Sequence, residues 1–165
     1  MLVAYLPSPW GRLQASSTGG ALWGFSFADL VPPSDAEVVD VALDEVLRSA
    51  ATWLDCYCAR RPLPPLPPLA WRGTSFRQAV WRCTLDIPWG QTANYAQIAN
   101  QAAALLGRPR ACSRAAGQAL GENPWVLMVP CHRVIGANGR LVGFAAGLAR
   151  KERLLAHESP QMELD

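Results

Sequence analysis

Cys131, His132 and Arg133 place a thiol, an imidazole and a guanidinium side by side in a chain with only two histidines. The thiolate, and not the thiol, is the nucleophile in cysteine chemistry, and a nearby imidazole or helix N-terminus can lower the thiol pKa enough to form it. Cys131 and His132 are therefore a candidate catalytic pair. The pair alone also fits a buried structural cysteine, because free cysteines are commonly buried.

The flanking residues predict how this pair is presented. The apolar run from Trp125 to Val129 predicts a buried strand or extended segment. Pro130 ends that segment because proline has no N–H to pair, and a glycine-rich stretch, residues 136–139, follows. We therefore expect Cys131 at the point where the backbone leaves a core.

The composition predicts a soluble globular protein in a reducing compartment. The 165 residues, half of them apolar, suffice for one core or two small units. We expect no signal peptide, no membrane span and a cytoplasmic location. The five cysteines lack a disulfide framework, which predicts free thiols. Cys56 and Cys58 fall on different faces of a predicted helix with no histidine nearby, so we expect no metal.

Charge is distributed unevenly along the chain. Residues 1–70 hold four arginines against seven acidic residues, whereas residues 71–165 hold eleven basic residues against six acidic ones. A basic C-terminal half suits a polyanion such as nucleic acid. An ordinary solvated surface explains the same counts equally well.

The first 68 residues predict a small α/β unit with a proline-rich connector. Short apolar runs over Met1–Phe27, with Gly19-Gly20 as a turn, predict a β-hairpin or meander. Ser34-Asp35 predicts the N-cap of an amphipathic helix running past Leu54. Five prolines between Pro62 and Pro68 predict a stiff extended connector. We place the domain boundary there, between residues 1–68 and 69–165.

The C-terminal part predicts a series of helices. One opens at Thr74-Ser75, and a turn over Ile87–Thr92 follows it. Two more span Tyr95–Leu106 and Ala111–Leu120, ended by glycines. Two short helices about four residues apart predict a helix-turn-helix.

Two helices carry features that invite a functional explanation. Residues 114–119, Arg-Ala-Ala-Gly-Gln-Ala, have little bulk, which permits either tight helix packing or a close approach to DNA. The arginine at their start favours DNA. The last predicted helix, Leu148–His157, ends beside Glu158, and a carboxylate at a helix C-terminus opposes the macrodipole.

Together these residues resemble the O6-alkylguanine-DNA alkyltransferases, also called methylated-DNA–protein-cysteine methyltransferases. The most specific motif is Pro130-Cys131-His132-Arg133-Val134-Ile135-Gly136, and Leu154-Leu155-Ala156-His157-Glu158 supports it independently. The resemblance covers residues 73–158 nearly without interruption and the first seventy only loosely. Its further motifs are Gly73-Thr74-Ser75-Phe76, Val80-Trp81, Ile87-Pro88 to Gly90, Thr92 to Tyr95, Arg114-Ala115, Gly117, Ala119, Asn123-Pro124, Gly139, Gly143-Phe144 and Gly147-Leu148.

The resemblance implies an α+β fold, with a small β-rich, RNase H-like N-terminal domain and a helical C-terminal domain containing a helix-turn-helix. It implies direct-reversal DNA repair by a monomer that binds double-stranded DNA in the minor groove and flips out O6-alkylguanine. O4-alkylthymine is a second candidate substrate. The alkyl group would pass irreversibly to the protein's own cysteine in a single turnover, with no cofactor and no metal.

The resemblance also implies roles for particular residues. Cys131 matches the alkyl acceptor, and His132 and Glu158 match a relay that forms the thiolate through a bound water. Asn123 matches a supporting hydrogen-bonding residue, and Tyr95 matches the tyrosine that polarises or protonates the guanine. Arg114 matches an arginine that fills the space vacated by the base, beside further expected DNA contacts at Ala115, Ala116, Gly117 and Thr92. The expected base contacts are Val134, through its carbonyl, Phe144 and Ala145, through its N–H.

Two other classes of function compete with this interpretation: a different enzyme, and a non-enzymatic protein that is either a lesion-binding module or a regulator. A Cys-His-Glu hydrolase or acyltransferase would use the same relay, but it would need an oxyanion hole and would turn over. A lesion-binding module of the alkyltransferase-like type would lack the acceptor cysteine, which is present here. A helix-turn-helix regulator would read the major groove with polar side chains, which residues 115–119 mostly lack.

Overall fold

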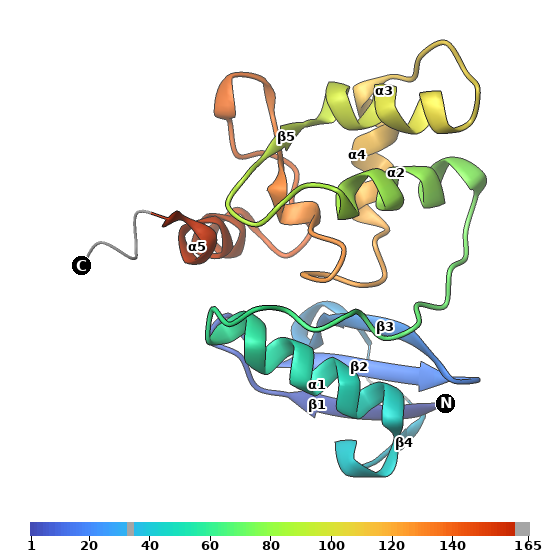
Figure 1. Ribbon diagram of the computed structural model, residues 1–165, viewed down its shortest axis with the longest axis vertical. Coiled ribbons are helices and arrows are strands. Elements are labelled where there is room, and N and C mark those ends of the chain that lie inside the picture. Colours follow the sequence, from blue (N-terminus) through green and yellow to red (C-terminus); the bar gives the residue numbers. More distant parts are fainter. Residues whose placement is uncertain (33–34, 161–165) are drawn as a thin grey trace. The chain divides into compact units, whose positions relative to one another are not determined.

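The computed structural model describes residues 1–32 and 35–160, and the chain divides into two compact units, Met1–Trp71 and Arg72–Asp165 (Figure 1). The predicted boundary at residue 68 lies three residues earlier. The connector's end still belongs to the first unit, because Leu22 N–H donates to the Pro68 carbonyl at 2.7 Å and Ala70 N–H donates to the Leu22 carbonyl at 2.9 Å. Within the described ranges, no helix has the length and apolar character needed to cross a membrane.

The N-terminal unit is built on a four-stranded sheet in the order β3-β2-β1-β4. The strands are β1 (Leu2–Leu6), β2 (Leu13–Thr18), β3 (Ala21–Phe27) and β4 (Glu37–Val38). The predicted meander is confirmed, because β1, β2 and β3 pair antiparallel. Gly19 and Gly20 form its turn with φ of +58° and +77°, which glycine adopts without strain.

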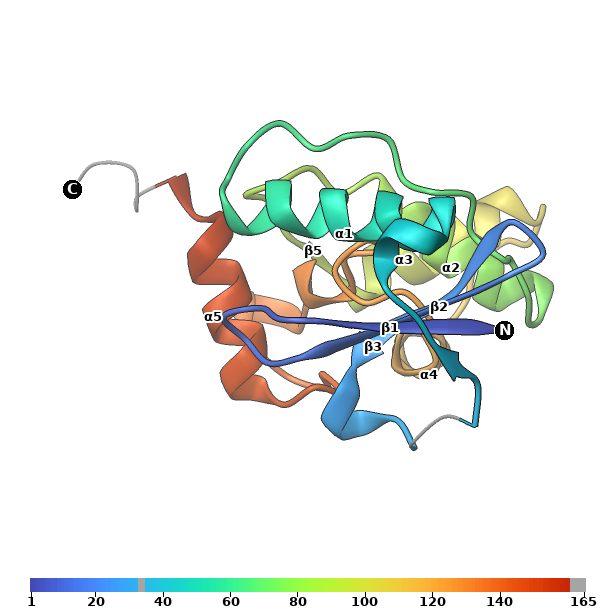
Figure 2. The ribbon, with the colours of Figure 1, turned by 90° about the horizontal axis from the view of Figure 1, so that it is seen from below.

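One helix, α1 (Glu45–Cys58), lies against the sheet (Figure 2). The prediction that this helix starts at Ser34-Asp35 is wrong, and Ser34 itself lies outside the described residues. Glu37 and Val38 instead form β4, parallel to β1, and a 3₁₀ turn, η2 (Val41–Leu43), comes before the helix. Asp44 is the N-cap, and its carboxylate accepts from Leu47 N–H at 2.8 Å.

Aromatic side chains fill the core of the N-terminal unit. Trp53 stacks on Tyr57 with ring centroids 5.3 Å apart, and Phe25 and Trp10 meet this pair edge-on. All four are buried. This unit therefore has a hydrophobic core of its own. A short 3₁₀ turn, η1 (Ala28–Leu30), comes directly after β3.

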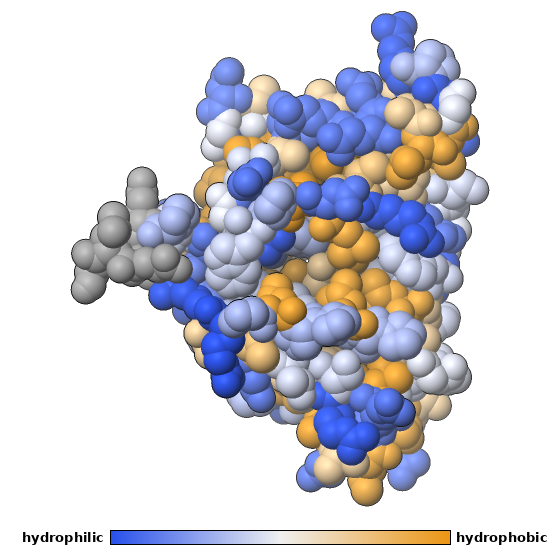
Figure 3. Space-filling view, viewed as in Figure 1, coloured by the Kyte–Doolittle hydropathy of each residue, from blue (hydrophilic) through white to orange (hydrophobic). Residues whose placement is uncertain are grey.

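The C-terminal unit packs α2 (Ser75–Leu85), α3 (Tyr95–Leu105) and α4 (Ser113–Gly121) against one another (Figure 1). The three predicted helices are confirmed, with ends that shift by one or two residues. Trp81 lies in the core, where its ring meets Trp125 at 5.7 Å and its Nε1 donates to the Ala119 carbonyl at 2.8 Å. Hydrophilic side chains cover much of the outer surface of α2 and α3 (Figure 3). The connection between α3 and α4, residues 106–112, is longer than predicted.

A short parallel pair of strands brings distant parts of this unit together. β5 (Ala93–Asn94), just before α3, pairs with β6 (Val134–Ile135), just after a 3₁₀ turn, η3 (Cys131–Arg133). The last helix, α5 (Leu148–Glu158), contacts η3, and another 3₁₀ turn, η4 (Ala137–Gly139), lies in the loop before it. The start of α3, the cysteine turn and the end of α5 are thereby held near one another.

Candidate active site

The segment before Cys131 is buried, but it is not extended. Residues 126–128 form turns, and Leu127 has a φ of +68°. The predicted strand over Trp125–Val129 is therefore wrong, although the burial it implied is correct, because Trp125 and Val129 are fully buried. Asn123 supports these turns: its Oδ1 accepts from Trp125 N–H at 2.9 Å and its Nδ2 donates to the Val129 carbonyl at 2.8 Å.

Cys131 begins the turn η3 and is only 7% exposed. Burial raises the pKa of the Cys131 thiol, while hydrogen bonding from Asn123 and the positive charge of Lys151 oppose that rise. In the free protein Cys131 is accordingly a thiol, and a base must take its proton before it can act as a nucleophile.

His132 and Glu158, which the resemblance predicts to act as a relay, are in direct contact. His132 Nε2 lies 2.6 Å from Glu158 Oε2, and both side chains are buried. The His132 Nδ1 atom is also buried and has no hydrogen-bond partner among the described residues. Burial is the main cause that lowers the pKa of His132, and it outweighs the opposing effect of Glu158. A neutral imidazole that donates from Nε2 leaves Nδ1 free to accept a proton.

Arg133 is the second partner of Glu158, and sequence reasoning assigned it no role. Its Nε donates to Glu158 Oε1 at 2.7 Å, and its Nη2 donates to Oε2 at 3.2 Å. Burial alone would raise the pKa of Glu158, but the hydrogen bonds and charges of His132 and Arg133 lower it to about 2. Glu158 is therefore a carboxylate at every physiological pH.

Lys151 is a further functional candidate that sequence reasoning missed. Its side chain is fully buried, and its Nζ donates to the Val134 carbonyl at 2.6 Å and to the Val142 carbonyl at 3.0 Å. It also lies 3.4 Å from the Tyr95 hydroxyl, which itself donates to the Val142 carbonyl at 2.7 Å. A signal was present in the sequence, because Lys151 is the only lysine among fifteen basic residues.

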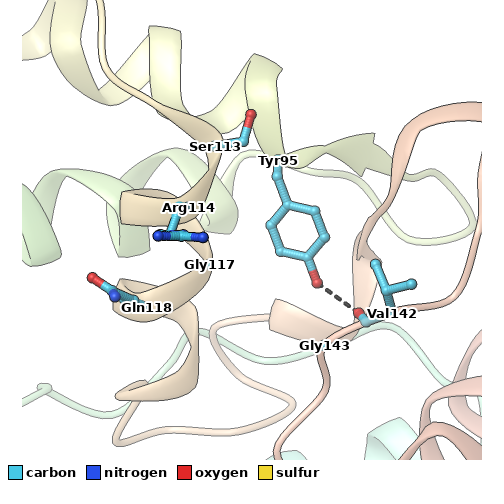
Figure 4. A pocket seen from close by; sticks show the side chains of 7 residues that line it. All are labelled: Tyr95, Ser113, Arg114, Gly117, Gln118, Val142 and Gly143. Carbon is cyan, nitrogen blue, oxygen red and sulfur yellow. Dashed lines mark hydrogen bonds between the residues drawn. The ribbon is translucent and has the colours of Figure 1, made fainter.

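A pocket of about 450 Å³ opens beside Tyr95, lined by Tyr95, Ser113, Arg114, Gly117, Gln118, Val142 and Gly143. Arg114 and Gln118 lie on α4 at one side, and the Tyr95 ring points toward the loop at Val142 and Gly143 (Figure 4). A Cβ on Gly117 would lie 3.9 Å from the Tyr95 ring, an ordinary van der Waals contact, so α4 passes beside the ring here. The volume accommodates a flat aromatic base.

The remaining predicted DNA- and base-binding residues do not line the pocket. Thr92 and Ala145 are exposed, and Ala115 and Phe144 are half-buried. Ala116 is fully buried, so the prediction that it contacts DNA is contradicted in this conformation. The Val134 carbonyl, expected to bind a base edge, is here occupied by Lys151.

Comparison with known proteins gives the family. The family model described as "6-O-methylguanine DNA methyltransferase, DNA binding domain" matches residues 75–160, more than half of the chain. The chain belongs to the 6-O-methylguanine DNA methyltransferase family. A family member from Methanosarcina acetivorans, named methylated-DNA–protein-cysteine methyltransferase, is 44% identical over 115 residues, which are 70% of each chain.

Two Mycobacterium tuberculosis comparisons define how far this likeness extends. The curated methyltransferase of that organism is 48% identical over 94 residues, so this chain spans about half (54%) of that relative's length. The crystal structure of M. tuberculosis OGT in complex with DNA has a TM-score of 0.80 and 31% identity, and the match covers 98% of both chains. The likeness to that methyltransferase structure therefore includes both units of the fold.

Proposed function

We propose that this protein repairs DNA by direct reversal, removing the alkyl group from O6-alkylguanine and keeping it on Cys131. The observation that carries this proposal is the buried Cys131-His132 pair, in which His132 Nε2 is held 2.6 Å from Glu158 and Nδ1 is left bare. An imidazole nitrogen with a free lone pair, on the residue that follows the thiol in the chain, can act as the base that this chemistry requires.

The transfer is a displacement at a saturated carbon. The Cys131 proton passes to His132 Nδ1, through a bound water, and the thiolate sulfur attacks the alkyl carbon. A sulfur–carbon bond forms as the carbon–oxygen bond breaks, and the electron pair of that bond stays with the purine. Guanine gains one proton from a donor at the pocket, and the proton held by His132 afterwards replaces it through solvent, so charge and atoms balance. The thioether is stable, so each molecule reacts once.

Tyr95 is the proposed proton donor to the departing guanine. Its hydroxyl lies at the pocket lined by Gly143 and Arg114, and burial raises the pKa of Tyr95, which keeps the hydroxyl protonated at neutral pH. A protonated donor prevents guanine from leaving as a poor anion. In the free protein this hydroxyl donates to Val142 and the Val134 carbonyl accepts from Lys151, so base entry exchanges these bonds for contacts with the base.

The DNA partner is proposed to be double-stranded and bound through the minor groove by α3 and α4 acting as a helix-turn-helix. Arg114 is exposed at the rim of the pocket, where it would fill the stack that the flipped base leaves. Thr92, Ala115 and Gly117 would lie along the DNA, and the Ala145 N–H and Phe144 would contact the base. We further propose that the protein works as a monomer in the cytoplasm without a cofactor.

The test follows a methyl label from a duplex with one O6-methylguanine to the protein. The proposal predicts one methyl group per protein molecule, no release of methanol or free label, and no transfer to a Cys131→Ser variant. Continuous release of product would indicate a hydrolase. Tight binding without transfer would indicate a lesion-binding module, and either result would overturn the proposal.

A further inference from the structure

Glu158 is shared between two cationic or potentially cationic partners. His132 and Arg133 Nη2 both meet the same oxygen, Oε2, at 2.6 Å and 3.2 Å, and Arg133 Nε takes the other oxygen at 2.7 Å. A planar guanidinium that engages both carboxylate oxygens is a strong and geometrically defined contact. The carboxylate that orients His132 is thus largely neutralised by Arg133.

The guanidinium is itself fixed in place from two further sides. Arg133 Nη1 donates to the Ile87 carbonyl at 2.7 Å, in the turn that leads to Trp89. The guanidinium carbon lies 5.9 Å from the centre of the Trp89 ring, and that ring meets His157 edge-on at 5.7 Å. Gly90, with φ of +80°, allows the turn to approach, because a Cβ there would lie 3.2 Å from the Glu158 carbonyl oxygen. Arg133 is therefore shielded from water as well as paired.

The charges around His132 decide whether its imidazole carries a proton. Glu158 favours the imidazolium, whereas the cations of Arg133 and Lys151 and the burial of the ring oppose it. Cys131 is its neighbour on the same turn, and His157 meets the Trp89 ring edge-on at the side of the cluster. Without Arg133, the full charge of Glu158 would act on His132 and favour the imidazolium. Its Nδ1 would then already carry a proton and could not accept the one from Cys131.

We propose that Arg133 is a positioning residue that shares the Glu158 carboxylate with His132, and so keeps the imidazole uncharged and able to take the Cys131 proton. This role rests on the proposed alkyl transfer, in which His132 is the base. It predicts that Arg133 affects the pH at which the protein works, and not only its stability.

The kinetic test compares single-turnover methyl transfer against pH in the wild type and in Arg133→Gln, Arg133→Lys and Arg140→Gln. The transfer rate falls at low pH as His132 becomes protonated, and this part of the pH profile is its acid limb. A change that raises the pKa of His132 therefore moves the acid limb to higher pH. Arg133→Gln should move the acid limb upward by about one pH unit or more. Arg133→Lys keeps the charge, and its acid limb should stay near that of the wild type even if transfer is slower. Arg140 is exposed, and its variant should not move the limb.

A second variant protects this test against misfolding. Trp89→Ala leaves Arg133 in place but opens its guanidinium to water, which should move the acid limb upward by a smaller amount. A purely structural role would lower the rates without moving the limb. An unchanged limb in the folded Gln and Trp89 variants would overturn the proposal.

A titration of the two histidines in the full chain separates this inference from the alkyl transfer itself. With ¹⁵N-labelled histidine, His132 should be the neutral Nε2–H tautomer at pH 7 and should remain neutral below its ordinary range near 6.5. A His132 imidazolium at pH 7 would overturn the inference even if Cys131 accepts the methyl group. Failed methyl transfer with a neutral His132 would instead count against the proposed function.

Discussion

The Nδ1 atom of His132 is buried and has no hydrogen-bond partner among the described residues. The tautomer of the imidazole ring is set by the Glu158 carboxylate. Glu158 accepts from Nε2 at 2.6 Å, which leaves the lone pair on Nδ1. A relay of this kind orients the base and stabilises the imidazolium that forms during proton transfer. In the proposed mechanism, the reactivity of Cys131 therefore depends on a carboxylate at the end of α5.

Glu158→Gln tests this dependence. A glutamine cannot stabilise an imidazolium and can present its amide N–H to the ring, so we expect methyl transfer to slow by roughly 10²-fold, within the range general-base catalysis contributes. Lesion binding should remain nearly intact, because Glu158 is buried away from the DNA. The measurement is the single-turnover rate beside the Kd for lesion DNA. An unchanged rate would remove Glu158 from the mechanism.

At the residue scale, the sequence predicted the site residues that belong to recognisable motifs. It did not predict the contacts that form only when distant residues pack together. Cys131, His132 and Glu158 were identified, and the structure brings them together. The burial of Arg133 and Lys151 was not predicted, because a basic residue in a sequence resembles a surface charge. Only packing shows that Lys151 is fully buried against two carbonyl groups.

The helix α4 carries the proposed link between the pocket and DNA. Its first turn presents Arg114, and Gly117 one turn later lines the same pocket beside Tyr95. An exposed arginine beside a pocket of base size suits a role in holding the duplex stack after the base has left.

Arg114→Ala should impair the reaction with duplex DNA far more than the reaction with free O6-methylguanine. Unstacking a base costs a few kcal/mol, so losing the residue that compensates for it should slow duplex repair by roughly 10- to 100-fold. The check is the ratio of the two rate constants, with Arg48→Ala as the control, since that exposed arginine lies on α1 in the N-terminal unit. Equal losses on both substrates would exclude the role.

At the element scale, prediction succeeded where a local signal and the tertiary fold agree. Helix α2 starts after the N-cap Thr74 and helix α3 starts at Tyr95, as predicted, and the structure adds a capping box of Asn94 and Gln97 before α3. It failed at residues 125–129, where a run of apolar residues is compatible with any buried conformation. It failed again before α1, because the partner strand β1 draws Val38 into the sheet, and its register is not visible in the local sequence.

At the scale of the whole molecule, the two units differ in charge and in content. The C-terminal unit contains every described site residue and most of the basic side chains, whereas acidic residues predominate in the N-terminal unit. The basic character of the C-terminal unit agrees with the match of residues 75–160 to a DNA-binding domain. We expect the buried ionic cluster of Glu158, His132 and Arg133 to make the stability of the C-terminal unit depend on pH.

Acid should destabilise the protein through this cluster. The Glu158 pKa is about 2 in the fold against 4.5 in a free side chain, so the unfolded chain binds more protons and stability falls as the pH drops from 4.5 toward 2. The loss should reach about 2 kcal/mol by pH 3. Urea unfolding at pH 7 and pH 3 should show this loss in the wild type and a smaller one in Glu158→Gln. Equal losses would contradict the assignment.

The most direct test of the central claim is the mass of the Cys131 peptide after the full chain meets a duplex with one O6-methylguanine. The account predicts a gain of one CH₂ unit on Cys131 and none on the other four cysteines. The molar amount of methylated Cys131 should equal the molar amount of O6-methylguanine repaired. A repaired lesion with an unmodified Cys131, or a methyl group on another residue, would contradict it.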